Sequence, residues 1–169
     1  MFNELILQGE AIVFFTGAGI STNSGIPDFR GPKGVWKTTQ PIYFQDFVNS
    51  KEKRIESWER KFSNELNIHE AKPNLGHLKI AEIMSKRQSS HLITQNVDNL
   101  HQESGVSESQ ITELHGNATY AKCLDCQLRY DLAELKESFL STKKPPQCNA
   151  CNGLIKTATI SFGQPMPEE

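Results

Sequence analysis

The sequence lacks any long hydrophobic run, since no apolar stretch approaches the roughly 20 residues that a membrane-spanning helix needs. It also lacks basic residues ahead of the short apolar stretch near its start, so we expect no secretory signal and a cytoplasmic protein. A strong positive charge is missing as well. The formal net charge is −2, which argues against a protein that binds nucleic acid through electrostatics. We therefore expect neither a membrane nor a nucleic acid as a partner.

Internal repeats and low-complexity tracts are absent too, and the 169 residues fall within the size range of one domain. Hydrophobic residues make up 37% and charged residues 22% of the chain, a composition that excludes a disordered tail.

Cysteine is absent from the first two thirds of the chain. Cys123 and Cys126 form one pair with two residues between them, and Cys148 and Cys151 form another. Without a secretion signal, such pairs indicate metal ligands rather than disulfides. Residues 127–147 separate the pairs, close to the zinc-ribbon spacing of about 15–20 residues. Four thiolates leave a tetrahedral ion no open position, so we predict a structural zinc site in a small region with almost no apolar core of its own. The alternative, four unrelated thiols, is disfavoured by the spacing.

Short apolar runs indicate buried strands at residues 11–15, 91–94 and 111–114, and a further strand is expected over residues 158–162. Segments with helical periodicity lie between the first three runs. This alternation is typical of an open parallel α/β sheet, which is the fold class that we expect.

Two helices are expected within residues 44–66, and a third begins after residues 73–74. Another, over about residues 99–104, ends at Gly105, because glycine commonly follows the last turn of a helix. The apolar face of the third helix is expected to comprise Leu75, Leu78, Ile80, Ala81, Ile83 and Met84.

The first strand runs into Gly17, Ala18 and Gly19, which resemble the start of a dinucleotide-binding turn. Thr22 stands where the usual pattern has its third glycine, so a plain strand–turn–helix remains an alternative. In either case Ser21 or Thr22 could cap the helical turn that follows.

The next segment, residues 25–34, is too rich in glycine and proline for regular structure and is expected to be a long loop. Within it, Arg30 could bind a phosphate with two hydrogen bonds and Phe29 could cover a planar ring, with Asp28 beside them. The alternative is an exposed loop with one buried anchor residue.

Polar side chains follow the second strand as Gln95, Asn96 and Asp98, where open α/β sheets form their ligand crevice. Asn96 or Asp98 could instead cap the next helix. His115 ends the third strand, and its imidazole could act as a general base at neutral pH or serve a structural role.

In their order along the chain, residues 17–21, 25–30, 94–101 and 114–116 and the two cysteine pairs resemble the sirtuin family, over about residues 11–167. The resemblance implies a Rossmann-like open parallel sheet with a small inserted zinc-ribbon lobe. Residues 1–117 and 157–169 would form a partial NAD-binding domain, and residues 118–156 would form the zinc-binding lobe.

The resemblance also implies an NAD-dependent protein-lysine deacetylase or deacylase, whose products are nicotinamide, O-acyl-ADP-ribose and free lysine. Its partners would be acylated lysines of proteins. His115 would be the general base, with Asn96 also catalytic. The residues implied to bind NAD are Gly17, Ala18, Gly19, Ser21, Ile26, Asp28, Phe29, Arg30, Gln95, Asn96, Val97 and Asp98.

The sequence departs from the family pattern at several places. Gln164 stands where glutamate is usual, in a segment over residues 161–164 that resembles the substrate-pairing strand. Lys61 and Asn64 replace the tyrosine and arginine of desuccinylase-type members, so we expect a preference for uncharged acyl groups. No segment matches the family's later strands, so we expect a sheet that is incomplete at the C-terminus. Mono-ADP-ribosyl transfer, NAD hydrolysis and an inactive truncated zinc-containing binding module remain alternatives, and the oligomeric state is not predicted.

Overall fold

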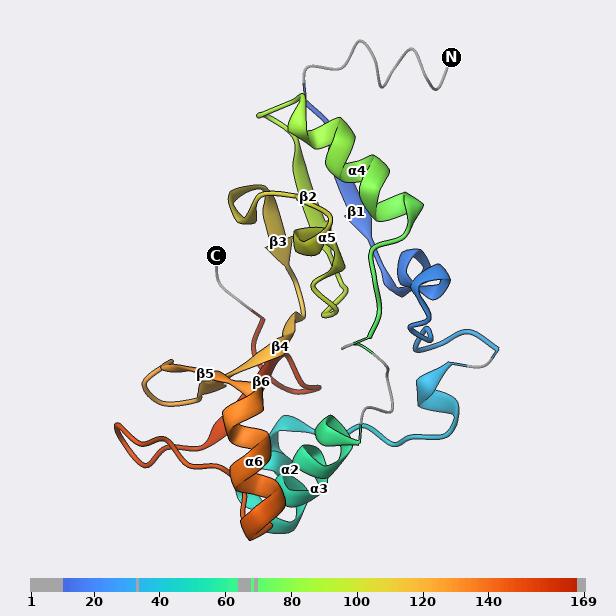
Figure 1. Cartoon of the computed structure of the whole chain (residues 1–169). Coiled ribbons are helices and arrows are strands. Elements are labelled where there is room, and N and C mark those ends of the chain that lie inside the picture. Colours follow the sequence, from blue (N-terminus) through green and yellow to red (C-terminus); the bar gives the residue numbers. More distant parts are fainter. Residues whose placement is uncertain (1–10, 33, 64–67, 69, 167–169) are drawn as a thin grey trace.

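The computed structural model describes residues 11–32, 34–63, 68 and 70–166. Its first sheet contains β1 (Val13–Thr16), β2 (His91–Thr94) and β3 (Ile111–Glu113), paired in parallel in the order β1-β2-β3 (Figure 1). The expected open parallel sheet is therefore confirmed, with β2 at the predicted residues and β1 shifted toward the glycine turn.

Two helices cover one face of this sheet: α4 (Leu75–Ser85) and α5 (Leu100–Glu103). Met84 of α4 packs with Leu92 of β2 and with Val106 in a buried cluster. We call β1–β3 with α4 and α5 the sheet lobe. Opposite this cluster, Val13 and Phe15 of β1 are 67% and 61% exposed.

The expected apolar face of α4 is partly wrong. Asn74 caps the helix, as its predicted start requires, but Leu75 and Leu78 are 69% and 49% exposed. Ala81 and Met84 are buried as expected, and the third buried position is a histidine, His77. The helix therefore buries a polar side chain where apolar periodicity alone selected leucine.

A 3-10 helix, η1 (Ala18–Ser24), follows β1, and a second, η2 (Val35–Lys37), directly follows the glycine- and proline-rich loop. The predicted capping of η1 by Ser21 or Thr22 is wrong, because Gly17 is the N-cap and both residues lie inside the helix. A third, η3 (Glu108–Gln110), precedes β3.

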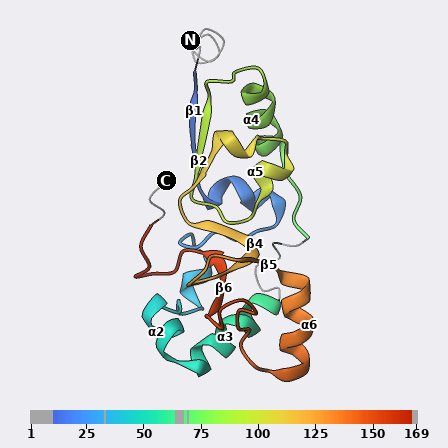
Figure 2. The same ribbon diagram turned by 90° about the vertical axis from the view of Figure 1, so that its left-hand side faces the viewer.

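The second sheet is antiparallel, with β5 (Arg129–Asp131), β4 (Gly116–Cys123) and β6 (Ile155–Thr159) in that order. Three helices lie beside it at the same end of the molecule in both views: α2 (Phe44–Asn49), α3 (Lys51–Phe62) and α6 (Leu132–Thr142) (Figures 1 and 2). We call these six elements the cysteine lobe. The strand expected at residues 158–162 thus begins and ends three residues earlier and pairs with β4.

The expectation of almost no apolar core around the cysteines is also wrong. Trp58 of α3 and Phe139 of α6 are buried in one cluster with Ile155 and with two of the cysteines, Cys123 and Cys148. This core is shared between α3, which precedes all four cysteines in the chain, and α6, which lies between the two cysteine pairs. Within the described residues, no helix is both long and apolar enough to cross a membrane.

Candidate functional site

A cavity of about 650 Å³ lies between the two lobes. The carboxyl ends of β1 and β2 point toward it (Figure 1), which is where open α/β sheets place their ligands. The predicted site residues on its wall are Ala18, Asp28, Phe29, Arg30, Gln95, Asn96, Val97 and His115. Sequence segments far apart in the chain therefore contribute to one cavity.

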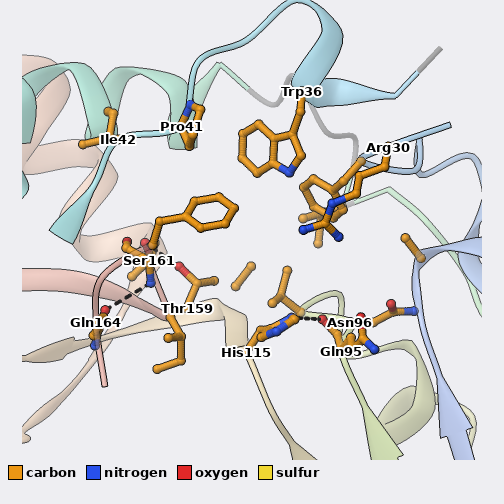
Figure 3. A pocket seen from close by; sticks show the side chains of 18 of the residues that line it. Arg30, Trp36, Pro41, Ile42, Gln95, Asn96, His115, Thr159, Ser161 and Gln164 are labelled. Carbon is orange, nitrogen blue, oxygen red and sulfur yellow. Dashed lines mark hydrogen bonds between the residues drawn. The ribbon is translucent and has the colours of Figure 1, made fainter. Parts of the chain in front are cut away.

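His115 is held by its neighbour on the adjacent strand end. Its Nδ1 lies 2.9 Å from the carbonyl oxygen of Gln95 (Figure 3). Because a carbonyl only accepts hydrogen bonds, Nδ1 carries a proton, and in the neutral imidazole Nε2 keeps its lone pair. Nε2 has no hydrogen-bond partner within the part of the chain that the structure describes. This is the state that a general base requires.

The backbone at Gly116 fixes the position of His115. The carbonyl oxygen of His115 accepts a hydrogen bond from Ile160 N at 2.8 Å. Gly116 has a φ of 69°, and a Cβ there would collide with the carbonyl oxygen of Ala158. Glycine is therefore required where the chain leaves the sheet lobe and enters β4.

Asn96 and Asp98 meet at the hydroxyl of Ser21. Asn96 Nδ2 donates to Ser21 Oγ at 3.0 Å, and Ser21 Oγ donates to Asp98 Oδ2 at 2.6 Å. The other carboxylate oxygen of Asp98 accepts from Leu100 N at 3.0 Å, at the start of α5. The N-cap of α5 is Asn99 and not Asn96 or Asp98, although Asp98 does bond the first backbone N–H of the helix. Asp98 also orients Asn96 through Ser21.

Two buried histidines lie behind this network. His77 Nδ1 accepts from Asn74 N at 3.2 Å, so its proton is on Nε2, which lies 3.4 Å from Ser21 Oγ. His101 Nε2 lies 3.0 Å from Thr16 Oγ1, and burial, with a smaller effect of His77, lowers the pKa of His101 to about 4. Neither histidine is among the residues that line the cavity.

The loop after η1 forms the opposite wall. Asp28 Oδ1 accepts from Gly31 N at 3.0 Å, which closes a turn, and Arg30 is exposed at the cavity wall (Figure 3). The ring of Phe29 contacts that of Trp36, with centroids 5.3 Å apart, and Trp36 contacts Phe162 at 5.9 Å. Trp36 was missed by the sequence analysis, although a tryptophan two residues after the glycine- and proline-rich loop was the available signal.

Residues 161–164 form a turn rather than the expected strand. Gln164 N donates to Ser161 O at 3.0 Å, and Ser161 N donates to Gln164 Oε1 at 3.2 Å (Figure 3). Both residues line the cavity, as does Phe162 between them. This turn directly follows β6, and two residues of β6, Thr157 and Thr159, also line the cavity. The sequence analysis did not identify either threonine as a site residue.

The remaining residues predicted to bind a cofactor lie beside the cavity rather than on its wall: Gly17, Gly19, Ser21, Ile26 and Asp98. Ile26 is buried in a cluster with Leu100 and Ala118, where Val97 packs against it. At Gly17 and Gly19, an added Cβ would meet no atom within 4 Å. The space beside these glycines is therefore open in the part of the chain that the structure describes.

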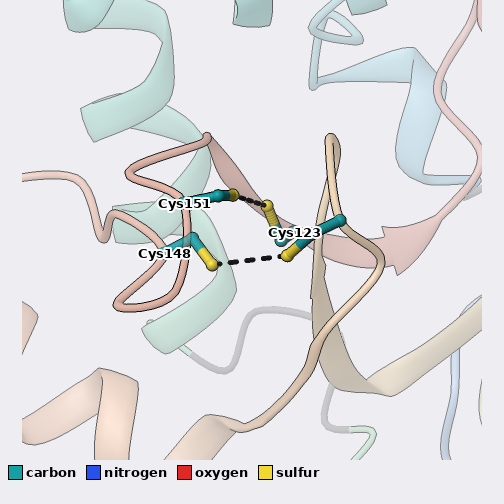
Figure 4. Close-up of side chains that lie close together, drawn as sticks. Cys123, Cys148 and Cys151 are labelled. Atoms are coloured by element: carbon teal, nitrogen blue, oxygen red, sulfur yellow. Dashed lines mark hydrogen bonds between the residues drawn. The ribbon is translucent and has the colours of Figure 1, made fainter.

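The four cysteines meet at one point of the cysteine lobe. Their sulfur atoms all lie within 4.8 Å of one another, with 3.5 Å between Cys123 and Cys151 and 3.6 Å between Cys126 and Cys148 (Figure 4). Tetrahedral zinc with Zn–S bonds of about 2.3 Å separates its sulfur ligands by about 3.8 Å, so these thiols fit one such ion. The hydroxyl of Tyr130 donates to Cys148 Sγ at 3.0 Å.

The Sir2 family model matches residues 17–169. An NAD-dependent protein deacetylase of Rhodopseudomonas palustris is 48% identical over 166 residues, which cover 98% of this chain and 66% of that protein. An NAD-dependent protein deacetylase of Thermotoga maritima is 36% identical over 171 residues, covering 99% of this chain and 67% of that protein. The chain thus spans about two thirds of the length of the curated relatives it matches.

Solved structures agree with this match. A Sir2 structure with a p53 peptide and NAD+ has a TM-score of 0.82 and 35% identity, covering 99% of this chain and 65% of the other. A second, with a deacetylated p53 peptide and 3′-O-acetyl-ADP-ribose, has a TM-score of 0.83 and 35% identity, covering 99% and 66%.

Proposed function

This chain belongs to the Sir2 family, with a Rossmann-like α/β fold, and from that premise we propose that the protein is an NAD-dependent protein-lysine deacetylase or deacylase. The observation that carries the proposal is the state of His115. Its imidazole has Nδ1 bonded to Gln95 O and Nε2 without a hydrogen-bond partner among the described residues, on the wall of a cavity that it shares with Asn96 and Phe29. Among the described residues that line the cavity there is no cysteine, and the one serine, Ser161, forms no hydrogen bond to His115.

We propose that NAD enters this cavity as the co-substrate. When bound, it supplies the ADP-ribosyl group that accepts the acyl group and releases nicotinamide. The open space beside Gly17 and Gly19 supports a close approach of phosphates to the η1 turn. Phe29 and Arg30 lie on the same wall as Ala18 and can cover the ligand.

The chain's own groups then have distinct tasks. His115 Nε2 accepts a proton from a ribose hydroxyl. Asn96, whose Nδ2 is fixed on Ser21, presents its Oδ1 as an oriented acceptor. Gln95 holds the His115 tautomer with its carbonyl oxygen and lines the cavity with its side chain. The apolar residues Val97, Phe29 and Trp36 limit water at the reacting centre, which strengthens these polar contacts.

We propose that the four cysteines hold one structural zinc ion. Four thiolates complete its coordination, so the ion would bind no substrate and would instead join the β4–β5 turn to the segment before β6. The division into an NAD-binding part, residues 1–117 and 157–169, and a zinc-binding part, residues 118–156, remains a proposal. The burial of Trp58 in one cluster with Phe139 supports adding α3 to the zinc-binding part, and α2 goes with it because Arg54 of α3 bonds two of its carbonyls.

The protein substrate is an acylated lysine. Trp36, Phe162 and Tyr43 form a row of ring contacts from the cavity wall outward, with 5.9 Å between Phe162 and each of the others. Such a row suits the apolar stem of a modified lysine and its flanking peptide.

The test is replacement of the proposed base. His115→Ala should reduce nicotinamide release with an acetyl-lysine peptide by about 100-fold or more, in the range of general-base catalysis. Zinc content should not change. His91→Ala, a half-buried histidine of β2 outside the cavity, is the matched control. Undiminished deacetylation by the His115 variant would remove this residue from the mechanism. Nicotinamide release that does not depend on the peptide would identify an NAD hydrolase instead.

A further inference from the structure

A second, smaller cavity of about 170 Å³ lies beside the one described above, at the edge of the cysteine lobe. Phe47 of α2, Ser57 and Arg60 of α3, and Lys156 of β6 line only this smaller cavity. Its volume is below the range of about 300–1,000 Å³ that whole small-molecule ligands occupy, so it has room for one small group and not for a nucleotide. Six residues line both cavities (Figure 3 labels all but Thr157): Trp36, Pro41, Ile42, Thr157, Thr159 and Ser161.

The wall of the smaller cavity carries positive charge and no negative charge. Lys156 and Arg60 are its charged residues, and among the described residues no aspartate or glutamate lines it. Cationic and hydroxyl side chains are donors that bind the oxygens of a phosphate group. Four residues with a hydroxyl group line the cavity as well: Ser57, Thr157, Thr159 and Ser161.

Lys156 is a buried cation with only neutral acceptors. It is 3% exposed, and its Nζ donates to the carbonyl oxygens of Thr159 at 2.5 Å and Thr157 at 3.4 Å. Within the described residues, no carboxylate forms an ion pair with it. Burial lowers the pKa of Lys156 to about 8, so about nine in ten molecules still carry the charge at pH 7. An anion in the cavity would offset the cost of removing this charge from water.

Arg60 brings a second cation to the cavity from α3. Its Nη2 pairs with Glu56, and its Nη1 donates to the carbonyl oxygen of Gln40 at 2.7 Å. A guanidinium has five N–H donors, so these two contacts leave donors for a ligand. Glu56 also pairs with Lys53, so this carboxylate is shared between two cations and neutralises neither fully.

The next residue of α3, Lys61, belongs to the larger cavity, where its Nζ donates to the carbonyl oxygen of Ala118 at 2.7 Å. Arg60 and Lys61 therefore face different cavities. The expected preference for uncharged acyl groups depends on Lys61 and on Asn64. Because Asn64 lies outside the described residues, that preference stays a prediction.

We propose that the smaller cavity is a binding site for a phosphate group, held by Lys156 and Arg60 together with the hydroxyl groups of Ser57 and Ser161. Within the described residues, neither of these two hydroxyl groups has a hydrogen-bond partner. The phosphate is either free inorganic phosphate or a phosphorylated side chain of the protein substrate. The second source rests on the proposed function, since Ser161 belongs to the turn that carries Phe162 of the aromatic row.

The first arm of the experiment is calorimetric titration of the whole protein with sodium phosphate at pH 7, with sodium chloride at equal ionic strength as the blank. Lys156→Met and Arg60→Met should each weaken phosphate binding by about 10-fold or more, the effect of losing a charge-assisted hydrogen bond. Lys156→Arg should retain most of the affinity. Lys53→Met is the matched control, because Lys53 pairs with Glu56 as Arg60 does but does not line the cavity. It should change the affinity by less than about 3-fold.

The second arm distinguishes the two sources of the phosphate. Acetyl-lysine peptides with phosphoserine within three residues of the acetyl-lysine, and the same peptides with serine, are titrated against the same proteins. If a phosphopeptide binds more tightly than its serine counterpart and Lys156→Met removes the difference, the site takes a phosphorylated substrate. If inorganic phosphate binds through Lys156 and the paired peptides bind equally, the site takes free phosphate.

Two results would overturn the inference. One is that neither inorganic phosphate nor any phosphopeptide binds in a way that depends on Lys156 or Arg60. The other is an equal loss of affinity in Lys53→Met, which would mean that the general charge of α3, and not a site, attracts phosphate. Lys156 is buried, so the melting temperature and zinc content of each variant identify a folding defect. Arg60→Met, at a partly exposed position, keeps the test decisive if Lys156→Met does not fold.

These results are separable from failure of the proposed function. The first arm contains neither NAD nor peptide, so phosphate binding through Lys156 stands even if no nicotinamide is released with any peptide. Conversely, if an acetyl-lysine peptide supports nicotinamide release while no phosphate binds, the deacylase function stands and the inference is wrong.

Discussion

The two lobes reach stability by different means. The cysteine lobe buries large aromatic side chains, Trp58 and Phe139, in one cluster and gathers four thiols at its edge. The sheet lobe buries a smaller apolar cluster on one face of β1–β3 and leaves Val13 and Phe15 exposed on the other. In place of a second apolar layer, it has a hydrogen-bonded network toward the cavity. The lobe with the larger core thus serves as support, while the lobe with the buried polar network contributes most of the reactive groups.

The strongest test of this difference is removal of a metal ligand. Cys148→Ala should abolish zinc binding and unfold the cysteine lobe, because binding of a structural zinc ion contributes about 10–16 kcal/mol to folding in zinc-finger peptides. Hydrogen exchange should show loss of protection in β4 and β6 and retained protection in β2. A chelator added to the wild-type protein is the matched treatment. Equal loss of protection in β2 would mean that the lobes fold as one unit.

A core truncation should give the next largest effect. Phe139→Ala should destabilise the protein by about 3–5 kcal/mol, because it empties a fully buried position between α3 and α6. Leu140→Ala, the exposed neighbour, is the control and should change the free energy of unfolding by about 0.5 kcal/mol or less. Urea titration measures both. A comparable effect of the two variants would contradict the assignment of α6 to the core.

The smallest effect should come from pH and should be confined to the sheet lobe. The pKa of His101 is about 4, lowered mainly by burial, against about 6.5 in the unfolded chain. Because the unfolded state then binds more protons between these values, stability is complete above pH 6.5 and falls as the pH is lowered toward 4. The slope is at most about 1.4 kcal/mol per pH unit.

Hydrogen exchange of β2 amides at pH 7.5 and 5.5 measures this slope and avoids the lower pH at which zinc would be released. His101→Gln should flatten it, even if the variant is less stable at both pH values. An unchanged slope in this variant would mean that other groups carry the pH dependence.

Prediction from the sequence succeeded where a feature depends on residues that are close together in the chain. β2 is where its apolar run predicts it, α4 begins after Asn74, and the cysteine pairs converge as their spacing requires. Each of these features depends on neighbouring residues or on a metal geometry.

Prediction from the sequence failed where a feature depends on contacts between residues that are far apart in the chain. The helical pattern of α3 carries no information on which lobe it joins, and Trp58 is placed by contact with a helix far along the chain. His77 was passed over in favour of Leu78 because its partner, the Ser21 hydroxyl, is distant in sequence. The cavity wall at Thr157 and Thr159 depends on the pairing of β6 with β4, which strand propensity alone does not predict.

Gly116, the residue after His115, marks the point where the chain crosses from the sheet lobe to the cysteine lobe. The chain passes from one lobe to the other within a single residue, and Ile160 of the returning segment is bonded to the same His115 carbonyl. The outgoing chain at Gly116 and the returning segment at Ile160 therefore both meet at His115, so the backbone of this residue is tied to both lobes. The same residue is tied a third time by its ring, whose Nδ1 is bonded to Gln95 O, so three contacts fix where the imidazole meets the cavity.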